Sequence, residues 1–184
     1  MASIFGHAIT TIAIGKSFPK SIIRWKFWLL GIGCSIVPDA DVIGFSFGIK
    51  YNSFWGHRGF SHSLLFALLL GVVITILFYS KDLKRKKTIT YILFFTLCTA
   101  SHGILDAMTS GGLGVAFFSP FEDTRHFFYW RPIQVSPIGI ERFFSERGFS
   151  VLKSEFVWIA LPSLIYILSL FVARKVNSKK KLEK

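Results

Sequence analysis

This chain has few cysteines and few acidic residues, and its amino-terminal segment lacks basic residues. Its two cysteines, Cys34 and Cys98, lie inside apolar runs, where cysteine behaves as a small buried hydrophobe, so they say little about the redox compartment. The first basic residue is Lys16, so the Lys/Arg-rich start of a signal peptide is missing and we expect no cleavage. Internal repeats and low-complexity linkers are also missing, and 184 residues suit one domain.

The shortage of acidic residues leaves the chain strongly basic. It has 10 Asp and Glu against 22 Lys and Arg, a net charge of +12, which by itself would suggest a nucleic-acid partner. The chain is also 52% hydrophobic, with a mean hydropathy of +0.51, which soluble domains rarely reach. Fifteen of its 22 basic residues form three clusters beside apolar runs, as in membrane proteins. This distribution argues against nucleic acid.

Five apolar runs alternate with these clusters. The last three approach the ~20 residues needed to span a bilayer, whereas the first two are shorter and are expected to be tilted, re-entrant or packed inside the bundle. We expect an all-α integral membrane bundle of about five helices, two short at the amino terminus and three longer, in one domain of residues 1–184. Ser61 is the expected cap of the third helix, and Pro162 is expected to kink the fifth or to lie in its first turns. The runs are residues 4–14, 27–37, 64–79, 89–108 and 156–173.

The basic clusters also predict the orientation. Cytoplasmic loops are enriched in Lys and Arg, and the clusters alternate correctly if all three are cytoplasmic. Only Asp82 and Glu183 of the ten acidic residues then share their side. We therefore expect a multi-pass membrane protein with its amino terminus outside and the basic tail, residues 174–184, in the cytoplasm. The clusters are Lys16, Lys20, Arg24 and Lys26; Lys81, Lys84, Arg85, Lys86 and Lys87; and Arg174, Lys175, Lys179, Lys180, Lys181 and Lys184.

Under this topology all five histidines and three aspartates lie on the extracytoplasmic side, near helix ends. The topology was inferred from lysines and arginines alone, so this coincidence is independent of it. His102 and Asp106 are four residues apart and share one helix face. Ionisable residues at membrane depth are costly and usually functional, so we expect a shared metal site. The candidate ligands are His7, Asp39, Asp41, His57, His62, His102 and Asp106.

The other two pairs converge only with particular backbones. Asp39 and Asp41 point the same way if the segment after Pro38 is extended. His57 and His62 are five apart, which no continuous helix aligns, but the glycine between them permits a turn that brings both inward. Mixed His/Asp ligands suit Zn²⁺, with Mn²⁺ or Fe²⁺ as alternatives. Seven candidates exceed one tetrahedral site, so we expect one to three ions.

The candidate ligands stand in short motifs: GHAIT, PDADVI, HRGFSHSLL and SHGILDAMTSGG, with PFEDTR further on. These resemble the YdjM-like family of membrane-bound metal-dependent hydrolases over residues 7 to about 131, and HRGFSHS with PD-x-D is the specific part. The resemblance implies a hydrolase of the inner membrane. The order early histidine, aspartate, histidine, then H-x-x-x-D is also similar, more faintly, to zinc-dependent phospholipase C and to helical nucleases with three zinc ions. That similarity favours phosphoester hydrolysis.

Hydrolases of this kind use metal ions to lower the pKa of a bound water from 15.7 to roughly 7. Asp39 and Asp41 are the expected catalytic carboxylates, which orient the water or bridge metals, and Arg58 is the expected catalytic arginine. Arginine can clamp phosphate oxygens bidentately. The long aromatic segment 109–155 is expected to lie at the interface or to cover the site as a lid. The candidate substrate-binding residues are Arg58, Arg125, His126 and Arg131.

Two other functions would use the same residue types: transport of metal ions or protons, and a metal-stabilised scaffold or regulator. A conduit needs polar groups along its whole path, whereas the cytoplasmic halves of the last three runs offer only small hydroxyls such as Thr75, Thr90 and Ser169. We therefore favour a hydrolase. The run 27–37 gives roughly 17 Å of helix in a hydrocarbon core ~30 Å thick. The site should then lie below the outer headgroups, which favours a lipid or amphiphilic phosphoester as substrate.

Overall fold

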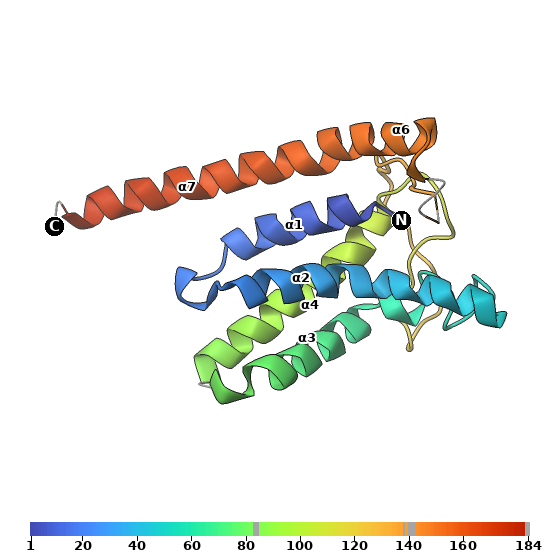
Figure 1. The fold of residues 1–184 in the computed structure, drawn as a ribbon, viewed down its shortest axis with the longest axis horizontal. Coiled ribbons are helices and arrows are strands. Elements are labelled where there is room, and N and C mark those ends of the chain that lie inside the picture. The colour runs from blue at the N-terminus through green and yellow to red at the C-terminus, as the bar shows by residue number, and fades with distance from the viewer. Residues whose placement is uncertain (83–84, 138, 140–142, 183–184) are drawn as a thin grey trace.

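The structure is a computed structural model that describes residues 1–82, 85–137, 139 and 143–182, and in these residues it is a bundle of five helical rods (Figure 1). The predicted fold class is therefore confirmed. Lys84, Glu183 and Lys184, named in the topology above, lie outside the described residues. The α-helices are α1 (Ile4–Lys16), α2 (Trp25–Ile36), α3 (Leu64–Tyr79), α4 (Arg85–Ala107), α6 (Glu146–Glu155) and α7 (Leu161–Leu182). Short 3₁₀ segments are η1 (Lys20–Ile22), η2 (Val37–Phe47), η3 (Phe60–His62) and η4 (Ser80–Asp82), and η5 (Phe156–Ala160) is a π-helical turn.

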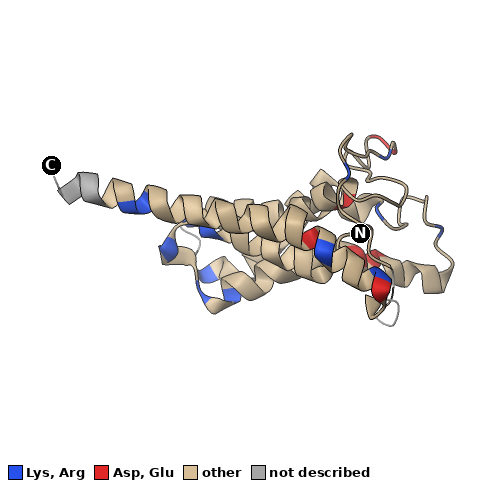
Figure 2. Cartoon of the chain, turned by 90° about the horizontal axis from the view of Figure 1, so that it is seen from above, with Lys and Arg blue, Asp and Glu red and all other residues tan. Residues whose placement is uncertain are grey.

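Helices α1, α2 and α4 pack against one another, α3 lies along α4, and α7 lies along α1 at the edge of the bundle (Figure 1). One end of the bundle shows basic residues alone, whereas the end that carries the amino terminus and the long loops shows acidic and basic residues together (Figure 2). The two ends of the bundle thus differ in charge, as the sequence predicted.

The helices long enough to cross a membrane are not the three expected. The spans are Trp25–Phe47, Lys86–Ala107 and Glu146–Ser178, while α3 is a shorter apolar helix of 16 residues. The prediction that the second run is short was wrong because the chain continues past Ile36 as η2. Pro38 does not end the rod, since it lies in the first turn of η2, where the α-helix changes to a 3₁₀ helix.

Helix α3 shows how the bundle is packed. Apolar residues cover every face of this helix, but its buried residues lie on one face, toward α4. They are spaced four apart: Ala67, Gly71, Thr75 and Tyr79. Its large aliphatic residues, such as Leu68 and Leu77, are exposed. Small residues inside and large ones outside are typical of helices that meet each other in lipid, where the apolar side chains face acyl chains.

Three local predictions are settled by the structure. Pro162 lies in the first turn of α7, directly after the π-turn, as expected. Cys34 and Cys98 are buried free thiols, also as expected. Ser61 does not cap α3, because its hydroxyl donates to Asp41 Oδ2 at 2.6 Å. The cap is Ser63, whose Oγ accepts the N–H of Phe66 at 3.1 Å.

The outer segment between α4 and α6, described for residues 109–137, 139 and 143–145, runs over the loop end of the bundle (Figure 1). Two isolated bridges join parts of this segment to each other: Thr109 pairs with Ile133, and Val115 pairs with His126. The Val115 pair exchanges two backbone hydrogen bonds of 2.9 Å. The N–H of Ala116 donates to the carbonyl of Arg58 at 3.0 Å, so this part of the segment lies beside the histidine loop.

Candidate metal centre

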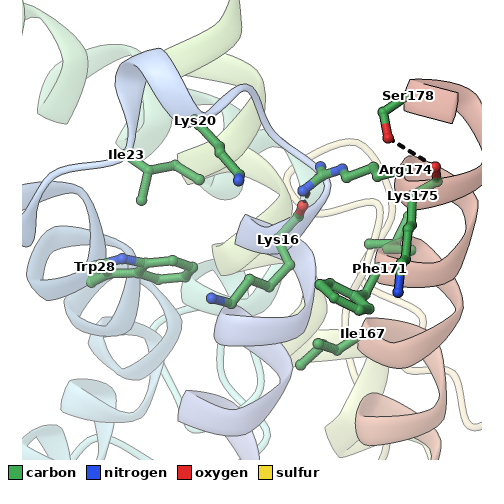
Figure 3. Close-up of a pocket in the computed structure, with 10 residues that line it drawn as sticks. Lys16, Lys20, Ile23, Trp28, Ile167, Phe171, Arg174, Lys175 and Ser178 are labelled. Carbon is green, nitrogen blue, oxygen red and sulfur yellow. Dashed lines mark hydrogen bonds between the residues drawn. The ribbon is translucent and has the colours of Figure 1, made fainter. Parts of the chain in front are cut away.

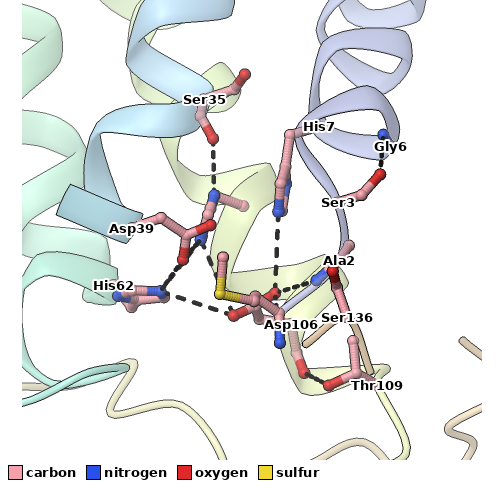
Figure 4. Close-up of polar contacts among 12 residues, drawn as sticks. Ala2, Ser3, Gly6, His7, Ser35, Asp39, His62, Asp106, Thr109 and Ser136 are labelled. Carbon is pink, nitrogen blue, oxygen red and sulfur yellow. Dashed lines mark hydrogen bonds and ion pairs between the residues drawn. The ribbon is translucent and has the colours of Figure 1, made fainter. Parts of the chain in front are cut away.

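Four residues from three separate segments converge at the loop end of the bundle (Figure 4). His102 and Asp106 come from one face of α4, Asp39 comes from η2, and His62 comes from η3. One ligand atom from each lies within 4.8 Å of the others, and all four residues are buried. The i, i+4 prediction for the α4 pair is thus confirmed, and α4 supplies half of the cluster.

Five of the six distances between the four ligand atoms are close to those of a tetrahedral site. The two Nε2 atoms of His62 and His102 are 3.1 Å apart. Asp39 Oδ1 is 3.7 Å from the first and 3.2 Å from the second, and Asp106 Oδ2 is 3.7 and 3.9 Å from them. Zinc bonds of 2.0–2.1 Å in a regular tetrahedron separate the ligands by about 3.3–3.4 Å. The arrangement therefore fits a zinc ion with shifts of a few tenths of an ångström.

The far side of each imidazole determines which nitrogen faces the centre. His102 Nδ1 donates to the backbone carbonyl of Ser35 at 2.7 Å. His62 Nδ1 lies 3.2 Å from Asp41 Oδ2 and 2.9 Å from Ser61 Oγ, whose own proton goes to Asp41. Both rings therefore carry a proton on Nδ1, and both Nε2 atoms turn toward the centre. Histidine ligands are typically held in this way by a carbonyl or carboxylate behind them.

Two neutral imidazoles arranged like this would point lone pairs at each other across 3.1 Å, so a positive species has to lie between them. Burial disfavours the charged form of His62, but Asp39, Asp41 and Asp106 outweigh it and raise its pKa to about 9. Without metal a proton fills this role. A divalent ion bound by the same atoms would replace that proton.

Unpaired buried atoms give a second test of the fit. Within the described residues, both carboxylate oxygens of Asp39 and Oδ2 of Asp106 are buried without a hydrogen-bond partner. Buried polar atoms nearly always have a partner, and a bound ion is one accepted explanation when they do not. These oxygens belong to the two carboxylates of the cluster, so a divalent cation there would supply the partner that Asp39 lacks and would add to the ion pair of Asp106 with Arg58.

Asp41 lies one layer behind the cluster. It accepts hydrogen bonds from His57 Nδ1 at 2.7 Å, from Ser61 Oγ at 2.6 Å and from the backbone N–H of Arg58 at 3.2 Å, and it faces His62 Nδ1. Its oxygens are thereby committed to donors. Asp41, His57 and His62 also form a second close group of ligand atoms, but in this arrangement Asp41 orients the two rings.

The expectation that Asp39 and Asp41 point the same way from an extended segment was wrong. Both lie in η2, and two positions apart in a 3₁₀ helix are on different sides of it. Asp39 therefore faces His102, whereas Asp41 faces His57.

His7 and His57 flank the cluster. The ring of His7 stacks on that of His102 at 3.9 Å, and its Nε2 is 3.9 Å from Asp106 Oδ1. His57 lies beyond His62, with ring centroids 5.3 Å apart, and burial lowers its pKa. The structure thus brings all seven predicted ligands together, four around one point and three around those four.

Arg58 is fully buried behind Asp106, not open to a substrate. Its Nε lies 3.1 Å from Asp106 Oδ2. Its two terminal nitrogens donate to Gly111 O at 2.8 Å and to Thr109 Oγ1 at 2.9 Å. Its φ of 65° is in the left-handed region, where non-glycine residues are uncommon and mark functional sites. The geometry gives Arg58 the role of positioning Asp106 and the loop after α4.

The other three predicted substrate residues lie around the loops. Arg125 donates to the backbone carbonyls of His57, Tyr51 and Ser53 at 2.7 to 3.2 Å, so it holds the histidine loop in place. Arg131 is exposed and lies 4.6 Å over the ring of Phe127. His126 lies 3.9 Å from Glu122, on the partly exposed surface. These three are outside both groups of possible metal ligands.

Some contributors were not predicted from the sequence. The backbone N–H of Ala2 donates to Asp106 Oδ1 at 2.8 Å, and the terminal amine lies 3.8 Å from the same oxygen. Backbone groups leave no side-chain signal. Glu155, whose carboxylate accepts from the N–H and hydroxyl of Ser3, does leave one, because it is an acid at the edge of a long apolar run.

Fold and site together define a helical membrane protein with a buried His/Asp cluster at one end of its bundle. The sequence profile described as YdjM inner membrane protein matches residues 1–177, so the chain belongs to this family. A relative, "Inner membrane protein YbcI" of Escherichia coli (strain K12), is 35% identical over 175 residues, which is 95% of this chain and 100% of that protein. No solved structure matches the chain.

Proposed function

We propose that the protein is a metal-dependent hydrolase of the inner membrane, with zinc held by Asp39, His62, His102 and Asp106, and that its substrate is an amphiphilic phosphoester. The observation that carries this proposal is the set of four buried ligand atoms, five of whose six mutual distances are 3.1–3.9 Å. When bound, a zinc ion acidifies a water molecule and polarises a phosphoester oxygen. Mn²⁺ and Fe²⁺ are alternative occupants of a His/Asp set.

The residues of this chain would orient and exclude. Ser35 and Asp41 fix the two imidazoles through their Nδ1 atoms, and Arg58 fixes Asp106. His7, stacked on His102, has both ring nitrogens buried and without a hydrogen-bond partner in the described structure. A neutral imidazole beside the centre is suited to accept or donate a proton during hydrolysis.

The depth and surroundings of the cluster support an amphiphilic substrate. Asp39 lies fourteen residues after Trp25, roughly 21 Å along a helical rod, which is short of the ~30 Å hydrocarbon core. An apolar cavity of about 300 Å³ lies between the start of α1 and the outer segment, lined by residues including Met1, Phe5 and Phe144. Ala2, next to this lining, donates to Asp106. An acyl chain in the cavity would therefore lie close to the cluster.

The test is hydrolysis by the purified protein. Lipid-like and short water-soluble phosphoesters are compared with and without a chelator, and after zinc is added back. We expect zinc-dependent turnover that is faster for the lipid-like ester and is lost, together with the bound zinc, in His102→Gln, whereas His126→Gln should keep its zinc. Chelator-insensitive turnover, or turnover retained in His102→Gln, would contradict the proposed site. Faster turnover of the soluble ester would contradict the amphiphilic substrate.

A metal-stabilised scaffold is the second candidate, because four protein ligands with full burial are typical of structural zinc sites. The same samples separate the two functions. Both a scaffold and a hydrolase should lose thermal stability on chelation. Only the hydrolase should hydrolyse the esters.

The proposed orientation places the His/Asp cluster on the extracytoplasmic side, because the basic clusters lie at the opposite end of the bundle (Figure 2). A reporter fused after residue 184 or inserted at residue 84 should be cytoplasmic. One inserted between residues 141 and 146 should be extracytoplasmic. The same location for both classes of insertion would contradict this orientation.

A further inference from the structure

The end of the bundle opposite the His/Asp cluster has a large cavity, about 860 Å³, between α7 and the turn that joins α1 to α2 (Figure 3). Four basic residues line it: Lys16 and Lys20 from the α1 side, and Arg174 and Lys175 from α7. The described lining includes no acidic residue. Four like charges around one space repel one another, and an anion bound among them would relieve that repulsion.

The two sides of the cavity are held in register by a direct contact. Arg174 donates to the backbone carbonyl of Lys16 at 2.6 Å. Lys16 is the last residue of α1, and the unpaired carbonyls at the end of a helix attract cations. The bond uses one of the five N–H donors of the guanidinium. Lys16 Nζ lies 5.5 Å over the ring of Trp28. Arg174 and Lys16, one from each side, therefore have defined positions at the cavity.

The rest of the wall is apolar. Ile167 and Phe171 lie on α7 before Arg174, and Ile23 and Trp28 face them from the other side (Figure 3). Phe171 lies three residues, about 4.5 Å along the helix axis, before Arg174, and the helix Glu146–Ser178 that is long enough to cross a membrane contains both. Charges at one end and apolar residues toward the bilayer match a phospholipid better than a free anion, which would contact only the charges.

We propose that this cavity binds an anionic phospholipid, with the phosphate of its headgroup among Lys16, Lys20, Arg174 and Lys175 and its acyl chains along Ile167 and Phe171. Basic pockets between membrane helices on the cytoplasmic side recognise such lipids. The site is separate from the proposed metal centre, at the other end of the bundle, and does not depend on the hydrolase activity.

The experiment uses the full-length protein in phosphatidylcholine nanodiscs with increasing fractions of phosphatidylglycerol whose acyl chains are brominated. Bromine quenches nearby tryptophan, and the difference between wild type and Trp28→Phe isolates the signal of Trp28. Brominated phosphatidylcholine is the lipid control, and inorganic phosphate is added as a soluble competitor. We expect half-maximal quenching at a low fraction of phosphatidylglycerol, little selective quenching by phosphatidylcholine and no competition by phosphate at millimolar concentration.

Each basic residue near a membrane surface changes lipid affinity roughly fivefold. Arg174→Gln/Lys175→Gln should therefore raise the phosphatidylglycerol fraction for half-maximal quenching roughly 25-fold, and Lys16→Gln/Lys20→Gln, an independent pair from the other wall, should do the same. Lys86→Gln/Lys87→Gln removes equal charge from the same end of the bundle but outside the cavity. Equal quenching by both lipids, displacement by phosphate, or equal loss in the Lys86/Lys87 control would each overturn the proposal.

Discussion

Replacing the buried arginine behind Asp106 should destabilise the whole bundle. Arg58 is 0% exposed, and its ion pair to Asp106 is 3.1 Å long. Arg58→Gln would leave that carboxylate without its buried cation and two acceptors, Thr109 Oγ1 and Gly111 O, without their donors. Breaking a buried ion pair by removing one partner costs about 3–5 kcal/mol. At about 2–4 °C per kcal/mol for a chain of this size, the Tm should fall by about 6–20 °C.

The assay is thermal unfolding of the purified protein in one detergent, in the presence of chelator so that metal does not contribute. Arg131→Gln is the matched control, since Arg131 is exposed and lies over the ring of Phe127. Surface substitutions usually change the free energy of unfolding by less than about 0.5 kcal/mol. Arg58→Lys should fall between the two, because it keeps the charge but loses the planar fork. A Tm for Arg58→Gln equal to that of Arg131→Gln would refute the assigned role.

Two further pairs of variants test the packing and the layer behind the cluster. Gly71→Leu should lower the Tm by an amount equivalent to about 1–3 kcal/mol, because even a Cβ there would lie 2.3 Å from Thr96 Oγ1. Gly33→Ala should leave the Tm unchanged, because its new Cβ would have no heavy atom within 4 Å. Equal stability of the two variants would contradict the tight α3–α4 contact. Ser61→Ala should weaken zinc binding about 10- to 100-fold in a metal titration, while Ser63→Ala should cost about 1 kcal/mol of stability and leave zinc affinity unchanged; the reverse pattern would contradict the assignment of these two serines.

The sequence predicted the bundle and the membership of the cluster for physical reasons. A membrane bundle needs long apolar runs, and its cytoplasmic end collects basic residues, so both features are visible without coordinates. His102 and Asp106 were placed correctly because a helix fixes the direction of residues four apart. The convergence of His57 and His62 was expected from a turn, although the positive φ falls on Arg58 and not on the glycine.

The roles within the cluster were harder to predict. The backbone of Asp39 and Asp41 was misjudged because a proline is compatible with either an extended segment or the first turn of a helix. The sequence indicated a substrate clamp at Arg58 because its motif shows only an arginine beside histidines. Its burial and its ion pair with Asp106, 48 residues further along the chain, are tertiary properties that the motif does not reveal. The carbonyl of Ser35 that orients His102 is a backbone group, so no residue type reveals it.

The most direct test of the account is the environment of the metal in the purified protein. Zinc content is measured together with X-ray absorption at the zinc edge, for wild type, His102→Gln and His126→Gln. We predict bound zinc surrounded by nitrogen and oxygen at 2.0–2.1 Å with no sulfur, present in wild type and His126→Gln and lost in His102→Gln. Protein that binds no divalent metal, or zinc that remains unchanged in His102→Gln, would contradict the central claim that these residues form a metal centre.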